Sequence, residues 1–107
     1  MPESKNSGAL TEAVLYIMIS LDQPLHGYGI MQKVLDLSDG RVNIGAGTLY
    51  GATNTLLKKK WIEPFKGESA RKKEYALTEL GRDVIEQEYQ RIKEVKNNVE
   101  RFRRGEL

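Results

Sequence analysis

Several side chains of this sequence could bind an anionic polymer, and they lie close together along the chain. Thr48, Tyr50 and Asn54 fall within seven residues, and their hydroxyl and amide groups suit phosphates or base edges. An asparagine can pair in bidentate fashion with adenine. Cationic side chains follow soon after: Lys58, Lys59, Lys60, Lys66, Arg71, Lys72 and Lys73. These residue types predict contacts with a nucleic acid.

The distribution of charge points the same way. The net charge of the 107 residues is only +2, yet residues 41–77 carry 8 lysines and arginines against 3 acidic residues. Residues 1–40 carry 2 against 5, and residues 78–107 carry 7 against 7. A positive middle segment is typical of a nucleic-acid-binding surface. Taken alone, the three lysines at 58–60 are more typical of a solvated helix end that complements the helix dipole, and only their pairing with the cationic hairpin favours DNA.

Composition excludes several other kinds of chemistry. The chain has no cysteine and one histidine, His26, which rules out disulfides, cysteine-ligated metal centres and histidine-rich metal sites. The glycine-bearing run at residues 45–51 lacks the preceding strand of a dinucleotide-binding loop, so we interpret it as the start of a helix. No nucleophile with a matching base is recognisable. We therefore expect no enzyme activity, no metal and no cofactor.

Length and hydropathy indicate a single domain that does not enter a membrane. A chain of 107 residues has the size of one domain. Residues 1–10 lack the apolar segment of a signal peptide, and the longest apolar run, residues 13–19, is much shorter than the roughly 20 residues of a membrane span. We expect a soluble, cytoplasmic protein without a membrane partner.

Apolar periodicity predicts three helices in the first part of the chain, over residues 10–21, 26–37 and 48–60. Pro24 and the glycine-bearing residues 38–40 separate them. In the second helix Ile30, Val34 and Leu37 form the apolar stripe. The third helix would bury Leu49, Ala52, Leu56 and Leu57, which leaves Tyr50, Asn54 and Lys58 on its outer face.

Two strands and a long helix complete the chain. The strands are expected over residues 61–66 and 73–77, and Pro64 restricts the first to a sheet edge. Thr78 is a good N-cap for a last helix that reaches residue 102. This order predicts an α+β, mainly α fold: a winged helix-turn-helix at residues 10–77, a dimerisation helix at 78–102, and flexible ends at 1–9 and 103–107. In such a module one helix enters the major groove while the hairpin contacts the DNA alongside.

The last helix carries an apolar seam surrounded by charges, a pattern that favours a partner helix. Its apolar residues repeat every seven positions, and Glu88 interrupts them. We expect this seam and the first helix to form the contact of a two-fold homodimer. A small apolar effector that binds between the last helices of the two chains would then change the separation of the two DNA-reading heads. An alternative is that the last helix packs on the first helix of its own chain. The interface residues expected for the dimer or effector are Leu10, Val14, Ile17, Ile85, Ile92, Val95, Val99 and Phe102.

Three motifs resemble those of one family of regulators. Residues 24–30 (PLHGYGI), 47–51 (GTLYG) and 75–81 (YALTELG) are similar, in order and spacing, to successive motifs of the PadR-like transcriptional regulators. The resemblance covers residues 10–102 and implies a homodimeric winged-helix repressor, usually of a nearby detoxification, efflux or stress gene and often released by a small molecule. It also implies that Tyr28, Thr48 and Tyr50 lie at the DNA face.

The chain departs from the pattern of that family at several points. Many relatives have a proline where this chain has Ala46, which loosens the start of the reading helix. Glu74 replaces the first of two adjacent tyrosines in the second hairpin strand, where its charge would weaken DNA contact or face solvent. The last helix offers only Tyr89 and Phe102 in place of a drug-stacking tryptophan. The chain has no length for the extra C-terminal domain of longer members, so the resemblance implies the short form.

The sequence thus predicts a repressor that binds a palindromic operator as a homodimer. The cationic side chains would supply most of the affinity through phosphates, and the third helix would supply sequence choice. The alternative is a winged-helix protein-interaction adaptor that makes no specific contact with DNA. The DNA-binding residues expected are Tyr28, Thr48, Tyr50, Asn54, Lys58, Lys66, Arg71, Lys72 and Lys73.

Overall fold

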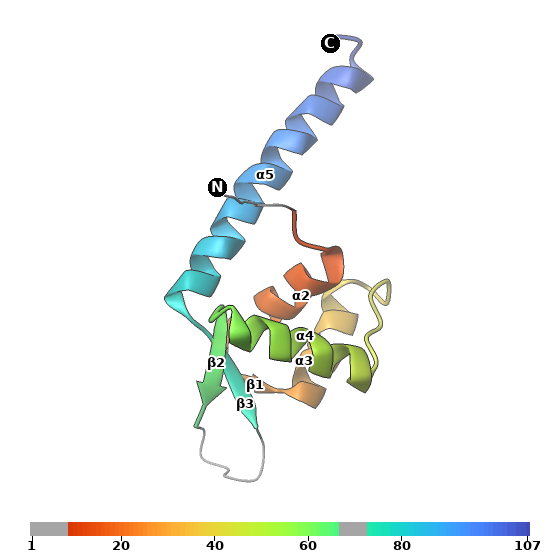
Figure 1. Cartoon of the computed structure of the whole chain (residues 1–107). Coiled ribbons are helices and arrows are strands. Elements are labelled where there is room, and N and C mark those ends of the chain that lie inside the picture. Colours follow the sequence, from red (N-terminus) through yellow and green to blue (C-terminus); the bar gives the residue numbers. More distant parts are fainter. Residues whose placement is uncertain (1–8, 67–72) are drawn as a thin grey trace.

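A computed structural model describes residues 9–66 and 73–107, which form a head of short helices around a small sheet and one long helix that projects from it (Figure 1). The head contains helices α2, α3 and α4, and the projecting helix is α5. In chain order the elements are α2 Glu12–Ser20, β1 Leu25–His26, α3 Gly27–Leu37, α4 Ala46–Lys58, β2 Ile62–Phe65, β3 Glu74–Leu77 and α5 Glu79–Arg103. The predicted fold class, a winged helix-turn-helix with a long C-terminal helix, is confirmed.

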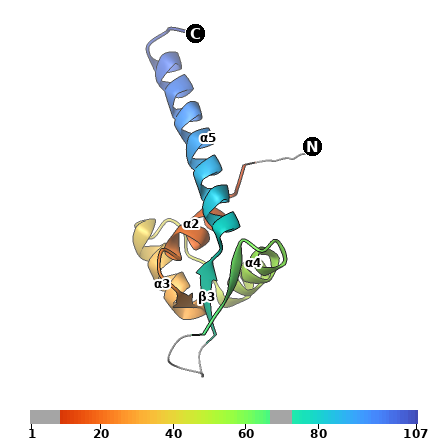
Figure 2. The same cartoon turned by 90° about the vertical axis from the view of Figure 1, so that its left-hand side faces the viewer.

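The sheet has three antiparallel strands in the order β1-β3-β2. The sequence predicted only two of them. β1 is two residues long, and it pairs with β3 so that Leu25 lies opposite Tyr75 and His26 opposite Glu74. β2 lies at an edge of the sheet, as the missing N–H of Pro64 requires. Figure 2 shows α3 and α4 on opposite sides of β3.

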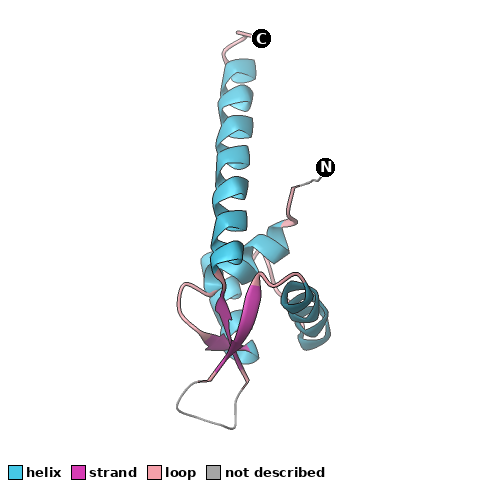
Figure 3. Cartoon of the chain, turned by 60° about the vertical axis from the view of Figure 1, so that its left-hand side comes forward, coloured by secondary structure: helices cyan, strands magenta, loops and turns pink. Residues whose placement is uncertain are grey.

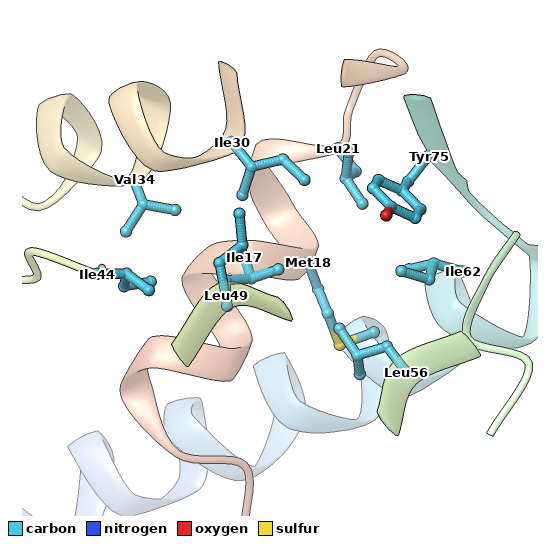
Figure 4. Close-up of a cluster of buried hydrophobic side chains, with 10 residues drawn as sticks. All are labelled: Ile17, Met18, Leu21, Ile30, Val34, Ile44, Leu49, Leu56, Ile62 and Tyr75. Carbon is cyan, nitrogen blue, oxygen red and sulfur yellow. The ribbon is translucent and has the colours of Figure 1, made fainter. Parts of the chain in front are cut away.

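The core lies where α2, α3, α4 and the sheet meet (Figure 4). α2 is central because it is apolar on nearly all of its faces. Two predictions fail here. Leu37 was expected on the buried stripe of α3 but is 48% exposed. Ile17 was expected at an interface but is 1% exposed, because it points into the core of its own head. The buried apolar residues are Ile17, Met18, Leu21, Ile30, Val34, Ile44, Leu49, Leu56, Ile62 and Tyr75.

α4 is displaced by two residues from its predicted range, since it begins at Ala46 and ends at Lys58. Its end has the hydrogen-bond pattern of a Schellman motif: the N–H of Trp61 donates to the carbonyl of Leu56 over 3.0 Å, and that of Lys60 to Leu57 over 3.1 Å. Lys60 takes the left-handed conformation, with φ of 62°. This motif ends α4 and directs the chain into β2.

Thr78 joins the start of α5 to the head. Its side chain accepts a hydrogen bond from the N–H of Gly81 over 3.0 Å, as predicted for an N-cap, and donates to the carbonyl of Lys60 over 2.6 Å. The backbone N–H of Thr78 also donates to the carbonyl of Trp61 over 3.1 Å. Gly81 packs so closely that a Cβ there would lie 2.0 Å from the carbonyl oxygen of Trp61. The first turn of α5 is therefore fixed against the strand that follows α4.

One face of α5 is covered in its first half and bare in its second. Gly81 and Glu88 are buried against the head, and Ile85 is half-buried there. The later residues of the same face are exposed, from 41% at Ile92 to 68% at Phe102. Packing on the chain's own first helix therefore accounts for only part of the predicted seam. The uncovered seam consists of Ile92, Val95, Val99 and Phe102.

Candidate nucleic-acid interface

The N-termini of α3 and α4 lie at the end of the head opposite to the C-terminus of α5 (Figure 1). The C-terminal end of β2 and the N-terminal end of β3 also point away from the C-terminus of α5 (Figure 3). These two helices start differently from the others. Thr11 and Thr78 cap α2 and α5 with side-chain hydrogen bonds, and an acidic residue follows each cap. α3 and α4 start at His26 and Gly45 without a side-chain cap and without an acidic residue in the first turn. Such ends attract anions, because their N–H groups and the positive end of the helix dipole face outward.

The outer face of α4 presents polar side chains in one row. Tyr50, Asn54 and Lys58 follow one another at a spacing of four residues and are all exposed. The opposite face, with Leu49, Thr53 and Leu56, is buried. Thr53 donates its hydroxyl proton to the carbonyl of Tyr50 over 3.2 Å, so this buried polar group is satisfied within the helix. The predicted division of α4 into a buried face and an exposed polar face is therefore present.

Two glycines on the outer side of α4 have no packing reason within the protomer. A Cβ added at Gly47 or Gly51 would meet nothing within 4 Å, and neither residue has a positive φ. Glycine inside a helix destabilises it by roughly 1 kcal/mol relative to alanine. The packing of the protomer therefore gives no reason for glycine at either position. The sequence interpretation treated residues 45–51 only as the start of a helix and missed this feature, although glycines within a helical pattern were the available signal.

Tyr28, at the start of α3, lies on the same end of the head as Tyr50. The two rings are 65% and 64% exposed, a high value for tyrosine. Between them lies a hollow of about 360 Å³ that α3, α4 and β3 line together. His26 also lines this hollow, and its ring centroid is 6.4 Å from that of Tyr28. We call Tyr28, Gly47, Tyr50, Gly51 and Asn54 the reading face, of which Gly51 forms the edge because it also lines the groove on the next side of α4.

Lys66 and Lys73 are the described cations of the hairpin, at the end of β2 and just before β3. Both are exposed. Arg71 and Lys72 lie outside the described residues. Lys58 is the C-terminal residue of α4. The neighbouring Lys59 lies over the ring of Trp61, and its Nζ is 4.9 Å from the ring centroid. The lysines at the C-terminal end of α4 are thus separate from the hairpin cations, of which Lys73 lines the hollow beside Tyr28 and Tyr50.

Thr48 is not brought beside Tyr50. It is exposed in the first turn of α4, but it lines a second, larger groove of about 950 Å³ between α4, the start of α2 and α5. Val84 and Arg91 of α5 line the same groove. Each residue of an α-helix is rotated by about 100° from the one before it, so the side chains of residues 48 and 50 point in directions more than a quarter turn apart. The three polar residues predicted to act together therefore belong to two sides of α4.

A family model for the PadR-like transcriptional regulators matches residues 14–87 of the chain. That span contains most of α2, all of α3, α4 and the sheet, and the first turns of α5. The chain belongs to this family. PadR-like proteins are transcription regulators rather than enzymes, and the resemblance noted from the three motifs is confirmed.

Relatives of this PadR-like chain are similar in sequence or in structure. An uncharacterized 37.1 kDa protein in a transposon of Streptomyces fradiae is 36% identical over 78 residues, which are 72% of this chain but only 22% of that protein. The chain thus spans about a fifth of that relative's length. A PadR family transcription regulator from hypervirulent Clostridium difficile matches with a TM-score of 0.72 at 23% identity, over 86% of this chain and 98% of that one. A winged-helix DNA-binding protein from STIV matches with a TM-score of 0.63 at 22% identity, over 78% and 86%.

The described residues offer little for other kinds of site in this PadR-like chain. They contain no group of three or more histidine, cysteine or acidic residues that could hold a metal ion. None of their helices is long and apolar enough to cross a membrane.

Proposed function

We propose that this PadR-like regulator binds duplex DNA with the reading face in the major groove. The observation that carries the proposal is the open glycine Gly47 beside Tyr50 and Asn54 on the exposed side of α4, followed one turn later by a second open glycine, Gly51, which lies between that side and the groove that Thr48 lines. A helix without Cβ atoms at two outward positions can approach a nucleic-acid backbone or a base edge more closely than one with them. The amide of Asn54 would contact a base edge, and Tyr28, Tyr50 and the more distant Thr48 would contact phosphates or bases.

Phosphate contacts would come from the ends of the elements beside the reading face. Lys66 and Lys73 flank it on the hairpin, and Arg71 and Lys72 lie between them in the sequence. The N-termini of α3 and α4 add backbone N–H groups at the same end of the head. These contacts fix the register of the protein on DNA and supply most of the affinity, whereas the reading face supplies sequence choice. Lys58 would contact a phosphate beyond the far end of α4.

The uncovered seam of α5 supports a homodimer. Four apolar side chains, each about one turn from the next, remain exposed on a helix that is otherwise rich in charged residues. A second α5 related by a two-fold axis would bury them, in the manner of a coiled coil. Leu10, Val14 and Ile85 lie half-buried at the root of α5 and would adjoin this contact, whereas Ile17 is left out because it belongs to the core. Two heads joined in this way read two half-sites, which predicts a palindromic operator.

We propose that the regulator acts as a repressor. A dimer on two half-sites of a promoter excludes other proteins from that DNA. A small apolar effector that lodges beside Val14, Ile92 and Val95 would release it, if the effector binds more tightly to an arrangement of heads that does not match the operator spacing. Such a regulator acts on cytoplasmic DNA, and we propose that location for it.

The experiment that tests the proposed function is a footprint on DNA upstream of the regulator's own gene, followed by fluorescence anisotropy over a range of salt concentrations. We expect a protected palindrome and a linear fall of log affinity with log salt. The double variant Lys66→Ala, Lys73→Ala should flatten the slope by about 0.9 for each phosphate that the protein no longer neutralises. Lys93→Ala, a cation on the side of α5 away from the head, is the matched control.

A winged-helix adaptor that binds another protein is the rival function. It predicts weak binding that is indifferent to DNA sequence and disappears near physiological salt. That result, together with an unchanged slope for the double variant, would contradict the proposed function.

A further inference from the structure

The hollow between Tyr28 and Tyr50 opens on the reading face and is lined mostly by apolar groups. Its volume is about 360 Å³, and it is built from the first two turns of α3, the first two turns of α4 and the start of β3. Lys73 and the ring of His26 also lie around it. The side chains that give it an apolar lining are Tyr28, Met31, Ala46, Leu49, Tyr50 and Tyr75.

This place in the fold restricts what the hollow meets when DNA is bound. In a helix-turn-helix protein, the N-terminal residues of the reading helix contact the edges of bases. Ala46, Leu49 and Tyr50 belong to that part of α4. A base edge that presents an amino group or a carbonyl oxygen to apolar side chains loses hydrogen bonds to water and gains none. The major groove offers one apolar group on its base edges, the 5-methyl group of thymine.

Resting on the proposed function, we propose that this hollow takes the 5-methyl edge of a thymine in each half-site of the operator. The hollow is wider than a methyl group, so it accommodates the C5 edge of the ring together with the methyl group. The two exposed tyrosine rings form its sides, and Leu49 forms its floor because this side chain is nearly fully buried. Thymine at this position is selected by an apolar contact, whereas Asn54, one turn further along α4, selects its base by hydrogen bonds.

The position of Ala46 makes the proposal testable. Ala46 is the first residue of α4, is exposed, and lines the hollow with its methyl group. A larger side chain there extends over the opening. Leucine is a good helix former, so Ala46→Leu alters the hollow without a penalty in helix propensity.

The test begins with selection of a preferred operator from a pool of random duplexes. Each thymine of that operator is then replaced by deoxyuridine, one symmetric pair at a time, which removes the methyl group and leaves base pairing unchanged. We expect one pair of thymines whose replacement lowers affinity by about fourfold per half-site, the factor that corresponds to burial of one CH₂-sized apolar group. Replacement of the other thymines should leave affinity unchanged.

The variants then assign this methyl group to the hollow. Ala46→Leu should bind the thymine and uracil operators with equal affinity. Asn54→Ala, the matched control on the same face, should lose affinity for both and keep the ratio between them. An operator that is insensitive to uracil at every thymine overturns the inference alone, as does an Ala46→Leu variant that still distinguishes the two operators. A selection that enriches no sequence overturns the proposed function and the inference with it.

Discussion

The carboxylate of Glu88 accepts a hydrogen bond from the backbone N–H of Leu10 over 3.2 Å, although the two residues lie 78 positions apart in the chain. Arg91 holds the same carboxylate from the other side, with its Nε 2.9 Å from Oε1 and a terminal nitrogen 2.7 Å from Oε2. Glu88 is 5% exposed and is the last residue of α5 buried by the head. It thus joins the segment before α2 to the point where α5 leaves the head.

Glu88→Gln is expected to reduce the free energy of unfolding at neutral pH by roughly 1–3 kcal/mol, because it removes a buried hydrogen-bonded charge and leaves the Arg91 guanidinium without its partner. Hydrogen bonds from Arg91 outweigh burial and hold the pKa of Glu88 below its ordinary value of 4.5. Since the folded state depresses this pKa, the carboxylate stabilises the protein above pH 4.5, and the contribution disappears as the pH falls through the lower folded pKa.

This pH dependence is checked by urea unfolding of the wild type and Glu88→Gln at one protein concentration. The unfolding is followed by circular dichroism between pH 3 and pH 7. The two stability curves should converge toward low pH. Glu86→Gln is the matched control and should follow the wild type, because Glu86 is an exposed carboxylate on the same helix that accepts a hydrogen bond from Gln90. Parallel curves for the wild type and Glu88→Gln across the whole range would show that the carboxylate has no such role.

Gly47→Ala and Gly51→Ala are expected to have opposite effects on stability and on DNA binding. Each should raise the free energy of unfolding by about 0.5–1 kcal/mol, because alanine is the better helix former and its Cβ meets nothing in the protomer. Each should also weaken operator binding, because the added Cβ occupies space that DNA approaches. Thermal unfolding and anisotropy on the same samples measure both effects. Variants that gain stability and bind DNA as tightly as the wild type would contradict the reading face.

Gly81→Ala provides the contrast. Its Cβ would lie 2.0 Å from the carbonyl oxygen of Trp61, so the start of α5 must shift. Overpacking of this kind typically costs about 1–3 kcal/mol. The same glycine-to-alanine substitution should therefore destabilise the protein at Gly81, where packing requires glycine, and stabilise it at Gly47 and Gly51.

Val99→Asp is expected to separate the dimer. Val99 is the centre of the uncovered seam, and a charge buried between two α5 helices would lose its hydration without gaining a partner. Asn97→Asp adds the same charge on the opposite side of α5 and is the matched control. Light scattering at micromolar concentration should give the mass of two chains for the wild type and for Asn97→Asp, and the mass of one chain for Val99→Asp. A wild type with the mass of one chain would contradict a dimer built on the seam.

Local sequence patterns predicted the elements that depend on local physics. The edge position of β2 follows from Pro64, the start of α5 from Thr78, and the buried face of α4 from the spacing of Leu49 and Leu56. The heptad pattern of the last helix likewise predicted a long α5 with one apolar face. Each of these signals lies within a few residues of the feature that it determines.

Features that depend on distant pairing were missed. β1 consists of Leu25 and His26, which form a strand only because Tyr75 and Glu74 of β3 lie opposite them. Ile17 fits an interface as well as a core by its spacing alone, and the packing of α3 and α4 around α2 decides between them. Glu88 interrupts an apolar pattern in the sequence, yet it is buried because Leu10 and Arg91 satisfy it.

The assignment of the candidate site residues to two sides of α4 also required the three-dimensional structure. Thr48 and Tyr50 are two positions apart, but helix geometry places them toward different grooves. The hollow at Tyr28 brings together residues from three separate elements, which no local pattern can indicate. Arg71 and Lys72, expected at the hairpin tip, remain predictions.

The most direct test of the reading face compares the wild type with Asn54→Ala. For each protein the affinity for the selected operator is divided by the affinity for a scrambled duplex of the same length and composition. Loss of a bidentate base contact should reduce this ratio by roughly the equivalent of 1–3 kcal/mol per half-site while binding to the scrambled duplex stays nearly unchanged. Asn98→Ala, an exposed asparagine on α5, is the matched control and should keep the ratio of the wild type. An undiminished ratio for Asn54→Ala, with Tyr50→Ala also without effect, would mean that DNA is read by another surface of the protein.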